Sequence, residues 1–336
     1  MRRRVRLLSH LATASLLTAC ASAPTTEQGA GARTAPGSGP AATSYPLEVA
    51  NCGHTVVFHA APERVVLLNS APTSALQAIG VLERTVARAG AFPPAYFDEA
   101  TRSTLEAIPS LGGDDIDAAG HFQISQEVVL AHEPDLVLGL PDGISRDALT
   151  DADIPVLEEP AMCPEGLPDP GFDDIYAQVA LYGEVFDQQD AAAEAIERLR
   201  ARVATLTTQA AGGRTAAVLF PTVGAGAGYA YGTRSMTHPQ LEAAGFTNAF
   251  ADVDERVFEV TLEEVLDRDP DVLVLLHVDG DPERVEAEIR GLPGADGLTA
   301  VANDDILVQL FNFSEPPTPL SIDGLERITA TFGDGS

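Results

Sequence analysis

The three cysteines of this chain stand where two kinds of covalent chemistry are expected. Cys20 directly follows Leu17, Thr18 and Ala19 at the end of an apolar stretch, and four arginines stand among the first six residues. This pattern is typical of a secretory leader closed by a lipobox, where a lipid is attached to the cysteine thiol. The stretch is too short for a permanent membrane helix, which needs about 20 apolar residues. We expect residues 1–19 to be removed and Cys20 to carry the lipid (palmitate); an ordinary leader with a chance cysteine is the alternative.

Cys52 and Cys163 remain once Cys20 is acylated. An even number of cysteines in an extracytoplasmic protein favours a disulfide between them. Two free buried thiols are the alternative. Metal binding by this pair is less favoured, because no histidine lies at zinc-like spacing from either residue.

Aromatic side chains gather in three of four stretches that are predicted to be loops at strand ends, where polar residues are the norm. Seven of the 13 Phe and 6 Tyr residues lie there. Such rings suit a bulky, partly apolar ligand, and an arginine among them could pair with a negative group. Each aromatic residue taken alone is equally consistent with core packing, and Arg88 and Arg146 are weaker candidates for contact. The candidate ligand contacts are Asn69, Ser70, Phe92, Tyr96, Phe97, Tyr229, Tyr231, Arg234, Phe311 and Phe313.

Motifs for catalysis are absent from the sequence. There is no G-x-S-x-G nucleophile turn and no H-E-x-x-H metal motif, so a secreted hydrolase is an unlikely alternative. The seven histidines are scattered, which disfavours a direct zinc or manganese carrier. His121, His238 and His277 lie near predicted loops and could bind a metal, although a lone histidine is more often structural. We expect no catalytic residue, no cofactor and no resident metal.

The charge and composition of the chain limit its partners. A formal net charge of −30 repels nucleic acid and anionic lipid. Residues 20–45 are rich in Ala, Gly, Pro, Ser and Thr, which predicts a flexible linker after the lipidated cysteine. We expect a monomer, anchored by lipid on the extracytoplasmic face of the cell membrane and free to reorient there.

An internal repeat predicts the elements that hold the candidate residues. Residues 125–139 and 262–276 both read as a short amphipathic helix, a Pro-Asp step and a run of buried β-type residues. Proline disfavours helix in the residue before it, and a short apolar run suits a strand covered on both faces. Residues 64–79 and 214–244 precede the two copies with a matching strand and helix. Two α/β lobes of Rossmann-like βα units follow.

A long helix is predicted between the lobes. Residues 190–209 show helical spacing of apolar residues and contain no Gly or Pro. At this length the helix spans about 30 Å, enough to cross from one lobe to the other as a single backbone strut. The expected organisation is a leader at 1–19, the linker at 20–45, an N-terminal lobe at 46–172, connecting helices at 173–211 and a C-terminal lobe at 212–332.

With these features in order, the chain resembles the class III solute-binding proteins of the periplasmic binding protein family, which serve siderophore, haem and cobalamin importers. The resemblance covers nearly all of residues 46–331 and includes Pro62 to Leu67, Leu76 to Val81, the two Glu/Pro-Asp phrases, Leu241 to Asn248 and Ser321 to Leu325. It implies a ligand cleft between the lobes, lined at the carboxyl ends of the strands. No single motif is specific, but their order and spacing are.

The resemblance also implies partners and a ligand. One exposed glutamate on each lobe would dock to arginines of the membrane permease, whose ATPase subunits drive transport; the matching positions are Glu127 and Glu263, with Glu264 a possible confusion. Many siderophore binders hold anionic chelates with several arginines, whereas this chain is acidic and places only Arg234 clearly in a cleft loop. We therefore expect a neutral or cationic iron(III) chelate of the hydroxamate siderophore type. Cobalamin is the next candidate, and haem follows it.

Overall fold

The computed structural model describes residues 42–112, 124–207, 213–221, 227–278 and 280–333. The predicted leader, Cys20, most of the predicted linker and His121 lie outside these ranges. Within them, Thr43 Oγ1 donates to the carbonyl of Glu184 at 2.7 Å, and the Tyr45 hydroxyl donates to the carbonyl of Val185 at 2.8 Å. These two residues therefore contact the folded body, although the sequence analysis assigns them to the linker. No described helix combines the length and the apolar character needed to cross a bilayer.

The N-terminal sheet is parallel, as the buried apolar runs predict. Its strands lie in the order β4 (Thr85–Arg88), β3 (Val65–Leu67), β5 (Leu136–Leu138) and β6 (Val156–Leu157). The two central strands are buried along their whole length, which fits a sheet covered on both faces. The helices of this part of the chain are α1 (Thr73–Ala78), α2 (Glu99–Ala107), α3 (Gln126–Leu130) and α4 (Arg146–Thr150).

The C-terminal sheet is mixed. Its strands lie in the order β10 (Val257–Thr261), β8 (Ala227–Tyr231), β7 (Thr215–Pro221), β11 (Val272–His277) and β12 (Ile306–Leu310), and β9 (Thr247–Asn248) pairs with the start of β7. Strands β7, β11 and β12 are parallel, whereas β8 is antiparallel to β7 and to β10. The expectation that residues 227–231 form a loop is therefore wrong, because their backbone pairs with strands on both sides. The helices are α7 (Thr237–Ala243), α8 (Leu262–Arg268), α9 (Pro282–Arg290), α10 (Thr299–Ala302) and α11 (Pro319–Phe332).

Both copies of the repeat fold as helix, stop and buried strand. Helix α3 leads into β5, and α8 leads into β11. Glu133 and Asp269, the residues before each proline, have left-handed φ angles of 46° and 40°, so the chain turns at the same point in both copies, although α3 ends at Leu130 and α8 at Arg268. The aspartate after each proline then binds the neighbouring strand: Asp135 accepts from the backbone N–H of Arg64 at 2.8 Å, and Asp271 accepts from that of Thr215 at 2.8 Å.

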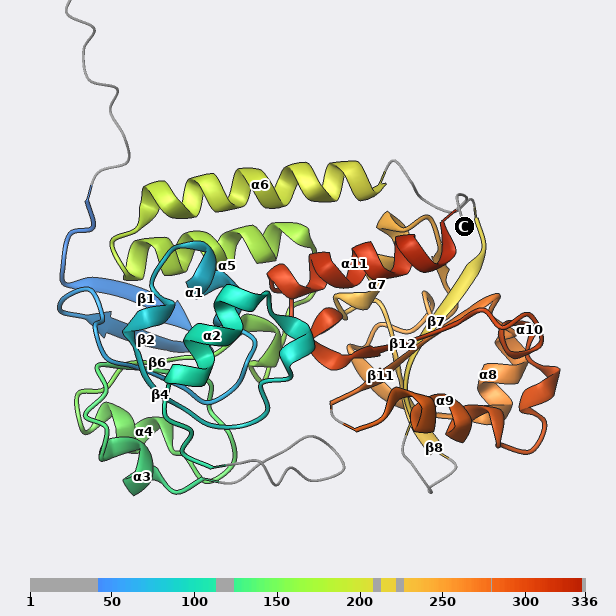
Figure 1. The fold of residues 1–336 in the computed structure, drawn as a ribbon, viewed down its shortest axis with the longest axis horizontal. Coiled ribbons are helices and arrows are strands. Elements are labelled where there is room, and N and C mark those ends of the chain that lie inside the picture. Colours follow the sequence, from blue (N-terminus) through green and yellow to red (C-terminus); the bar gives the residue numbers. More distant parts are fainter. Residues whose placement is uncertain (1–41, 113–123, 208–212, 222–226, 279, 334–336) are drawn as a thin grey trace, which may run out of the picture. The chain divides into compact units, whose positions relative to one another are not determined.

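Several packed helices, rather than a single long helix, connect the two sheets. Helix α6 (Gln189–Thr207) agrees with the predicted long helix and contacts α1 and α5 (Phe172–Val185) on one side of the chain and α7 and α11 on the other. Helices α5 and α11 lie beside α6 (Figure 1). One apolar core runs through this region and includes residues of both sheets, such as Leu67, Val218 and Leu276. The link is therefore a packed layer of helices.

The segment after β6 is held by the N-terminal hairpin of β1 (Leu47–Asn51) and β2 (His54–Phe58). At the tip of this hairpin, Cys52 forms a disulfide with Cys163, the pairing that the cysteine count favours. Asn51 Nδ2 donates to the carbonyl of Glu158 at 2.8 Å, and Asn51 Oδ1 accepts from its backbone N–H at 2.9 Å. One covalent bond and two hydrogen bonds therefore fix residues 158–163 in place.

Replacing both Cys52 and Cys163 with serine should lower the free energy of unfolding by roughly 2 to 5 kcal/mol, because the bond closes a loop with a sequence separation of 111. Chemical denaturation measures the change. A thiol reductant should bring the native protein to the stability of the double variant and leave the variant unchanged. Equal unfolding midpoints for the two proteins without reductant would contradict the prediction.

Glu159, in the same segment, is a buried acid with no cationic partner among the described residues. Its side chain is 4% exposed, Oε1 accepts from the Tyr182 hydroxyl of α5 at 2.9 Å, and Oε2 has no hydrogen-bond partner among the described residues. Burial raises the pKa of Glu159 to about 7, against the opposing effect of the Tyr182 hydrogen bond. The folded protein therefore holds a proton here that the unfolded chain releases near its ordinary pKa of 4.5.

This difference makes stability depend on pH. Between about pH 4.5 and 7 the folded state binds more protons at Glu159 than the unfolded state, so the free energy of unfolding should fall as pH rises, by about 2 to 3 kcal/mol. Glu159→Gln should remove this contribution, which denaturation at a series of pH values measures. Glu165→Gln, at an exposed position of the same segment, should keep the native pH dependence. An unchanged slope in Glu159→Gln would refute the assignment.

Candidate ligand-binding site

A cavity of about 680 Å³ lies where the carboxyl ends of strands from both sheets meet. Residues after β3, β4, β5 and β6 form one wall, and the ends of β7, β11 and β12 together with β8 form the other. This is the arrangement expected for a ligand site in an α/β fold. The residues that line these two walls include Asn69, Ser70, Tyr96, Asp142, Glu158, Glu159, Met162, Phe220, Tyr229, Tyr231, Arg256, Val257, Phe311, Asn312 and Pro316.

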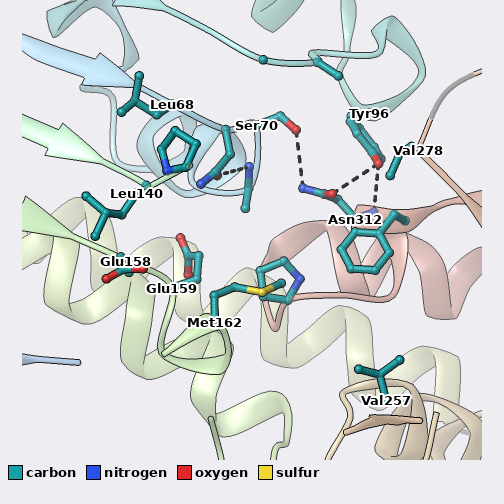
Figure 2. Close-up of a pocket in the computed structure, with 18 of the residues that line it drawn as sticks. Leu68, Ser70, Tyr96, Leu140, Glu158, Glu159, Met162, Val257, Val278 and Asn312 are labelled. Carbon is teal, nitrogen blue, oxygen red and sulfur yellow. Dashed lines mark hydrogen bonds between the residues drawn. The ribbon is translucent and has the colours of Figure 1, made fainter. Parts of the chain in front are cut away.

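Six of the ten predicted contacts line this cavity. Asn69 and Ser70 follow β3 directly, and the Asn69 side chain accepts from the backbone N–H of Ala71 at 3.0 Å, which shapes the turn. The other four are aromatic: Tyr96, Tyr229, Tyr231 and Phe311. Figure 2 shows Ser70 and Tyr96 on opposite sides of Asn312, with Glu158, Glu159 and Met162 together on another part of the wall.

The other four predicted contacts do not line the cavity. Phe97 and Phe313 are buried in the core, where both rings pack edge-on against Tyr96. Phe92 is partly buried, with the Arg88 guanidinium 5.1 Å from its ring centroid. Arg234 follows β8 in a turn that leads its side chain away, and its Nη2 donates to the carbonyl of Glu165 at 3.2 Å. The three aromatic rings pack against other side chains, and the Arg234 guanidinium binds a backbone carbonyl group.

Aromatic rings form much of the C-terminal wall. Tyr229 is 40% exposed and offers the most accessible ring. Phe220 and Phe311 meet edge to face with 6.3 Å between their centroids. Tyr231 is buried beside them, two residues from Tyr229 on the same strand and therefore on the same face of it. The wall can cover apolar parts of a ligand.

One hydrogen-bonded contact joins the two walls. The Tyr96 hydroxyl accepts from the backbone N–H of Asn312 at 2.9 Å and lies 3.4 Å from its Oδ1, while Asn312 Nδ2 lies 3.5 Å from Ser70 Oγ (Figure 2). Burial raises the pKa of Tyr96, so its hydroxyl remains protonated at neutral pH. Asn312 lies 216 positions from Tyr96 and 242 positions from Ser70 in the chain, and no local pattern indicates these contacts.

The charged groups of the wall were not predicted. Arg256, before β10, lines the cavity and pairs with the buried Glu315 at 3.2 Å. Glu158 also lines it and pairs with Arg146, which therefore supports the wall without being among its lining residues. Asp142 lies exposed at the wall after β5. Arg256 stands in an acidic stretch that carries no recognisable motif, and only the pairing of Val257 with Tyr231 brings it here.

Neither described candidate histidine lines the cavity. His277 is buried at the end of β11, and His238 lies in α7 with Nε2 3.5 Å from Glu242. Among the described residues, no group of three or more His, Cys, Asp or Glu side chains could hold a metal ion. Metal binding by these two histidines at the cavity therefore has no support.

The two predicted docking glutamates occupy matching positions outside the cavity. Glu127 is the second residue of α3, and Glu263 is the second residue of α8; both are exposed. Hydrogen bonds from its own backbone and from Ser125 lower the pKa of Glu127. Glu264 instead closes a capping box, because its Oε2 accepts from the backbone N–H of Thr261 at 2.8 Å. The local geometry thus distinguishes Glu263 from its neighbour.

Known proteins share the sequence family and the fold of this chain. Residues 65–308 match the model of the periplasmic binding protein family. A crystal structure titled as an ABC-type Fe³⁺-hydroxamate transport system from Saccharomonospora viridis DSM 43017 is 61% identical, with a TM-score of 0.82 over 86% of this chain and 100% of that one. No curated protein sequence matches the chain.

More distant structures share the fold alone. A periplasmic binding protein from Veillonella parvula is 16% identical, with a TM-score of 0.72 over 85% of this chain and 97% of that one. A periplasmic haem-binding protein from Roseiflexus sp. RS-1 is 20% identical, with a TM-score of 0.62 over 80% and 97%. Since the family match spans strands of both sheets and more than half of the chain, this chain belongs to the periplasmic binding protein family.

Proposed function

We propose that this protein captures an iron(III)-hydroxamate siderophore outside the cytoplasm and delivers it to the permease of an ABC importer. The observation that carries the proposal is the cavity of about 680 Å³, with aromatic rings on one wall and few unpaired charges. Its volume lies in the range of about 300 to 1,000 Å³ that is typical of small-molecule sites. The 61% identity to a protein titled as part of an Fe³⁺-hydroxamate transport system supports the same ligand class.

The charges of the wall favour a neutral or cationic chelate. Arg256 is the one cationic side chain among the described lining residues, and Asp142, Glu158 and Glu159 lie on the opposite wall. A strongly anionic chelate would meet the exposed Asp142 without a cluster of arginines in the wall to offset it. The aromatic rings of Tyr229, Phe220 and Phe311 would cover the apolar linkers between hydroxamate groups.

Cobalamin and haem remain the alternatives within the family, since its relatives include a vitamin B12-binding and a haem-binding protein. Histidine ligation of haem iron has no support from His238 or His277, because neither lines the cavity. This favours a ligand that already contains all donors to its iron.

The remaining sequence expectations complete the proposal. Residues 1–19 would act as a secretory leader, and Cys20 would be acylated, which tethers a monomer to the outer face of the cell membrane through residues up to about 45. Glu127 and Glu263 would contact arginines of the permease, because each is exposed at the start of the corresponding helix in its own lobe.

Ligand binding can be followed by quenching of tyrosine fluorescence, because the chain contains no tryptophan. We expect saturable quenching by ferric trihydroxamates and much weaker effects of ferric catecholates, haem and cobalamin. Tyr229→Ala should weaken hydroxamate binding about tenfold, the loss expected for an exposed aromatic contact. Tyr45→Ala, which alters an aromatic residue outside the cavity, should leave the dissociation constant unchanged. Failure of every hydroxamate to bind would refute the proposed ligand.

Docking should depend on the paired glutamates and not on ligand affinity. The double variant Glu127→Ala, Glu263→Ala should lose uptake in cells that carry the cognate permease, while its dissociation constant for the chelate stays at the native value. Glu264→Ala should weaken the α8 cap and retain uptake. Changed ligand affinity in the double variant, or full uptake by it, would show that these side chains do not have this role.

A further inference from the structure

Arg256 lines the cavity, and a buried carboxylate holds its guanidinium. The Arg256 side chain is 31% exposed, and its Nη1 donates to Oε2 of Glu315, a residue with no exposed surface, at 3.2 Å. Pro316, the next residue after Glu315, lines the same cavity. The Glu315 carboxylate therefore lies directly behind the cavity wall, close enough to act electrostatically on a ligand bound there.

Glu315 is a fully engaged hydrogen-bond acceptor. Its Oε1 accepts from Ser235 Oγ at 2.6 Å and from the backbone N–H of Met236 at 2.7 Å, and Oε2 accepts from Arg256. A backbone N–H and a guanidinium can only donate, so both oxygens act as acceptors, as in the ionised form. Burial raises the pKa of Glu315, but the guanidinium and the two donors on Oε1 stabilise the carboxylate.

The pair has no net charge but still offers donors. A guanidinium has five N–H groups in a fixed plane, and the hydrogen bond to Glu315 engages only Nη1. The fixed carboxylate orients that plane and offsets its positive charge for any group in the cavity. If the cavity were built to attract an anion, a buried acid behind its one described lining cation would work against it.

We propose that Arg256 determines specificity by donating hydrogen bonds to the oxygen atoms of an uncharged chelate, and that Glu315 positions Arg256 and cancels its charge. The inference rests on the proposed function. It adds that the preferred chelate is uncharged, and it names the two residues that determine this preference. Hydroxamate oxygens, which carry partial negative charge even in a neutral ferric complex, are suitable acceptors for such a donor. Asp142, which is exposed on the facing wall, acts in the same direction by disfavouring an anion.

Two probes with the same ferric trihydroxamate core but different charge test this inference. N-acetyl ferrioxamine B is neutral, and N-succinyl ferrioxamine B has the same ferric trihydroxamate core with an added carboxylate. The native protein should bind the acetyl probe more tightly. Glu315→Gln leaves the positive charge of Arg256 uncompensated, so the preference for the acetyl over the succinyl probe should fall about tenfold, chiefly through tighter binding of the succinyl probe.

Arg256→Gln should weaken binding of the acetyl probe about 10- to 100-fold, the range expected for lost hydrogen bonds from a charged donor, and should increase the preference for that probe. The double variant Arg256→Gln, Glu315→Gln removes both charges. It should bind both probes weakly and restore the native preference between them. Arg268→Gln is the matched control, because Arg268 is also ion-paired and 30% exposed but does not line the cavity. It should match the native protein with both probes.

The outcomes separate this inference from the proposed function. If the native protein binds neither probe, the hydroxamate assignment fails. If it binds both but Arg256→Gln retains native affinity, or Glu315→Gln weakens both probes equally, the role given to the pair is wrong. Should Glu315→Gln fail to fold, which thermal unfolding would reveal, comparison of Arg256→Gln with the double variant still decides, because a charge effect requires their preferences to differ.

Discussion

In each sheet, one aspartate carboxylate binds a central strand to its neighbour, at the end of the strands remote from the cavity. Asp135 accepts from the backbone N–H groups of Glu63 and Arg64 before β3, and Asp271 accepts from the backbone and hydroxyl of Thr215 in β7. Each aspartate also directly precedes the strand that pairs with the one it holds. The carboxyl ends of the parallel strands therefore emerge at a fixed edge of each sheet. The residues that line the cavity follow these ends, so the site depends on this alignment.

The two walls differ in how they are held. The N-terminal wall is a set of short segments, and residues 158–163 depend on the hairpin tip at Asn51 and Cys52 for their position. The C-terminal wall rests on β8, whose backbone pairs with strands on both sides. Tyr96 and Asn312 then connect the walls through hydrogen bonds. A ligand thus meets one surface fixed by a sheet and another fixed by a covalent bond and a few polar contacts.

Periodicity and repetition made much of this architecture predictable. The Pro-Asp phrases located α3, β5, α8 and β11, and the rule that ligands bind at strand ends located Asn69, Ser70 and Phe311. Features that depend on distant pairing were missed. The glycines around β8 favour a loop, and the two strands that pair with it lie in other segments of the chain. For the same reason the sequence indicates Arg234 as a ligand contact and does not indicate Arg256. Nothing in the local sequence distinguishes an arginine that lines a cavity from one that binds a carbonyl group.

The acidity of the chain is a poor guide to the charge of its cavity. Although the formal net charge is −30, the groups at the wall are balanced one by one: Glu158 by Arg146, and Arg256 by Glu315. Within the described part of the chain, Glu159 has no cationic partner, and burial brings its pKa to about 7, so near neutral pH it is partly uncharged. Asp142 is then the most exposed acid of the wall. The electrostatic environment of a ligand in the cavity therefore depends on these local pairings, since surface charges more than about 10 Å away are largely screened at physiological salt.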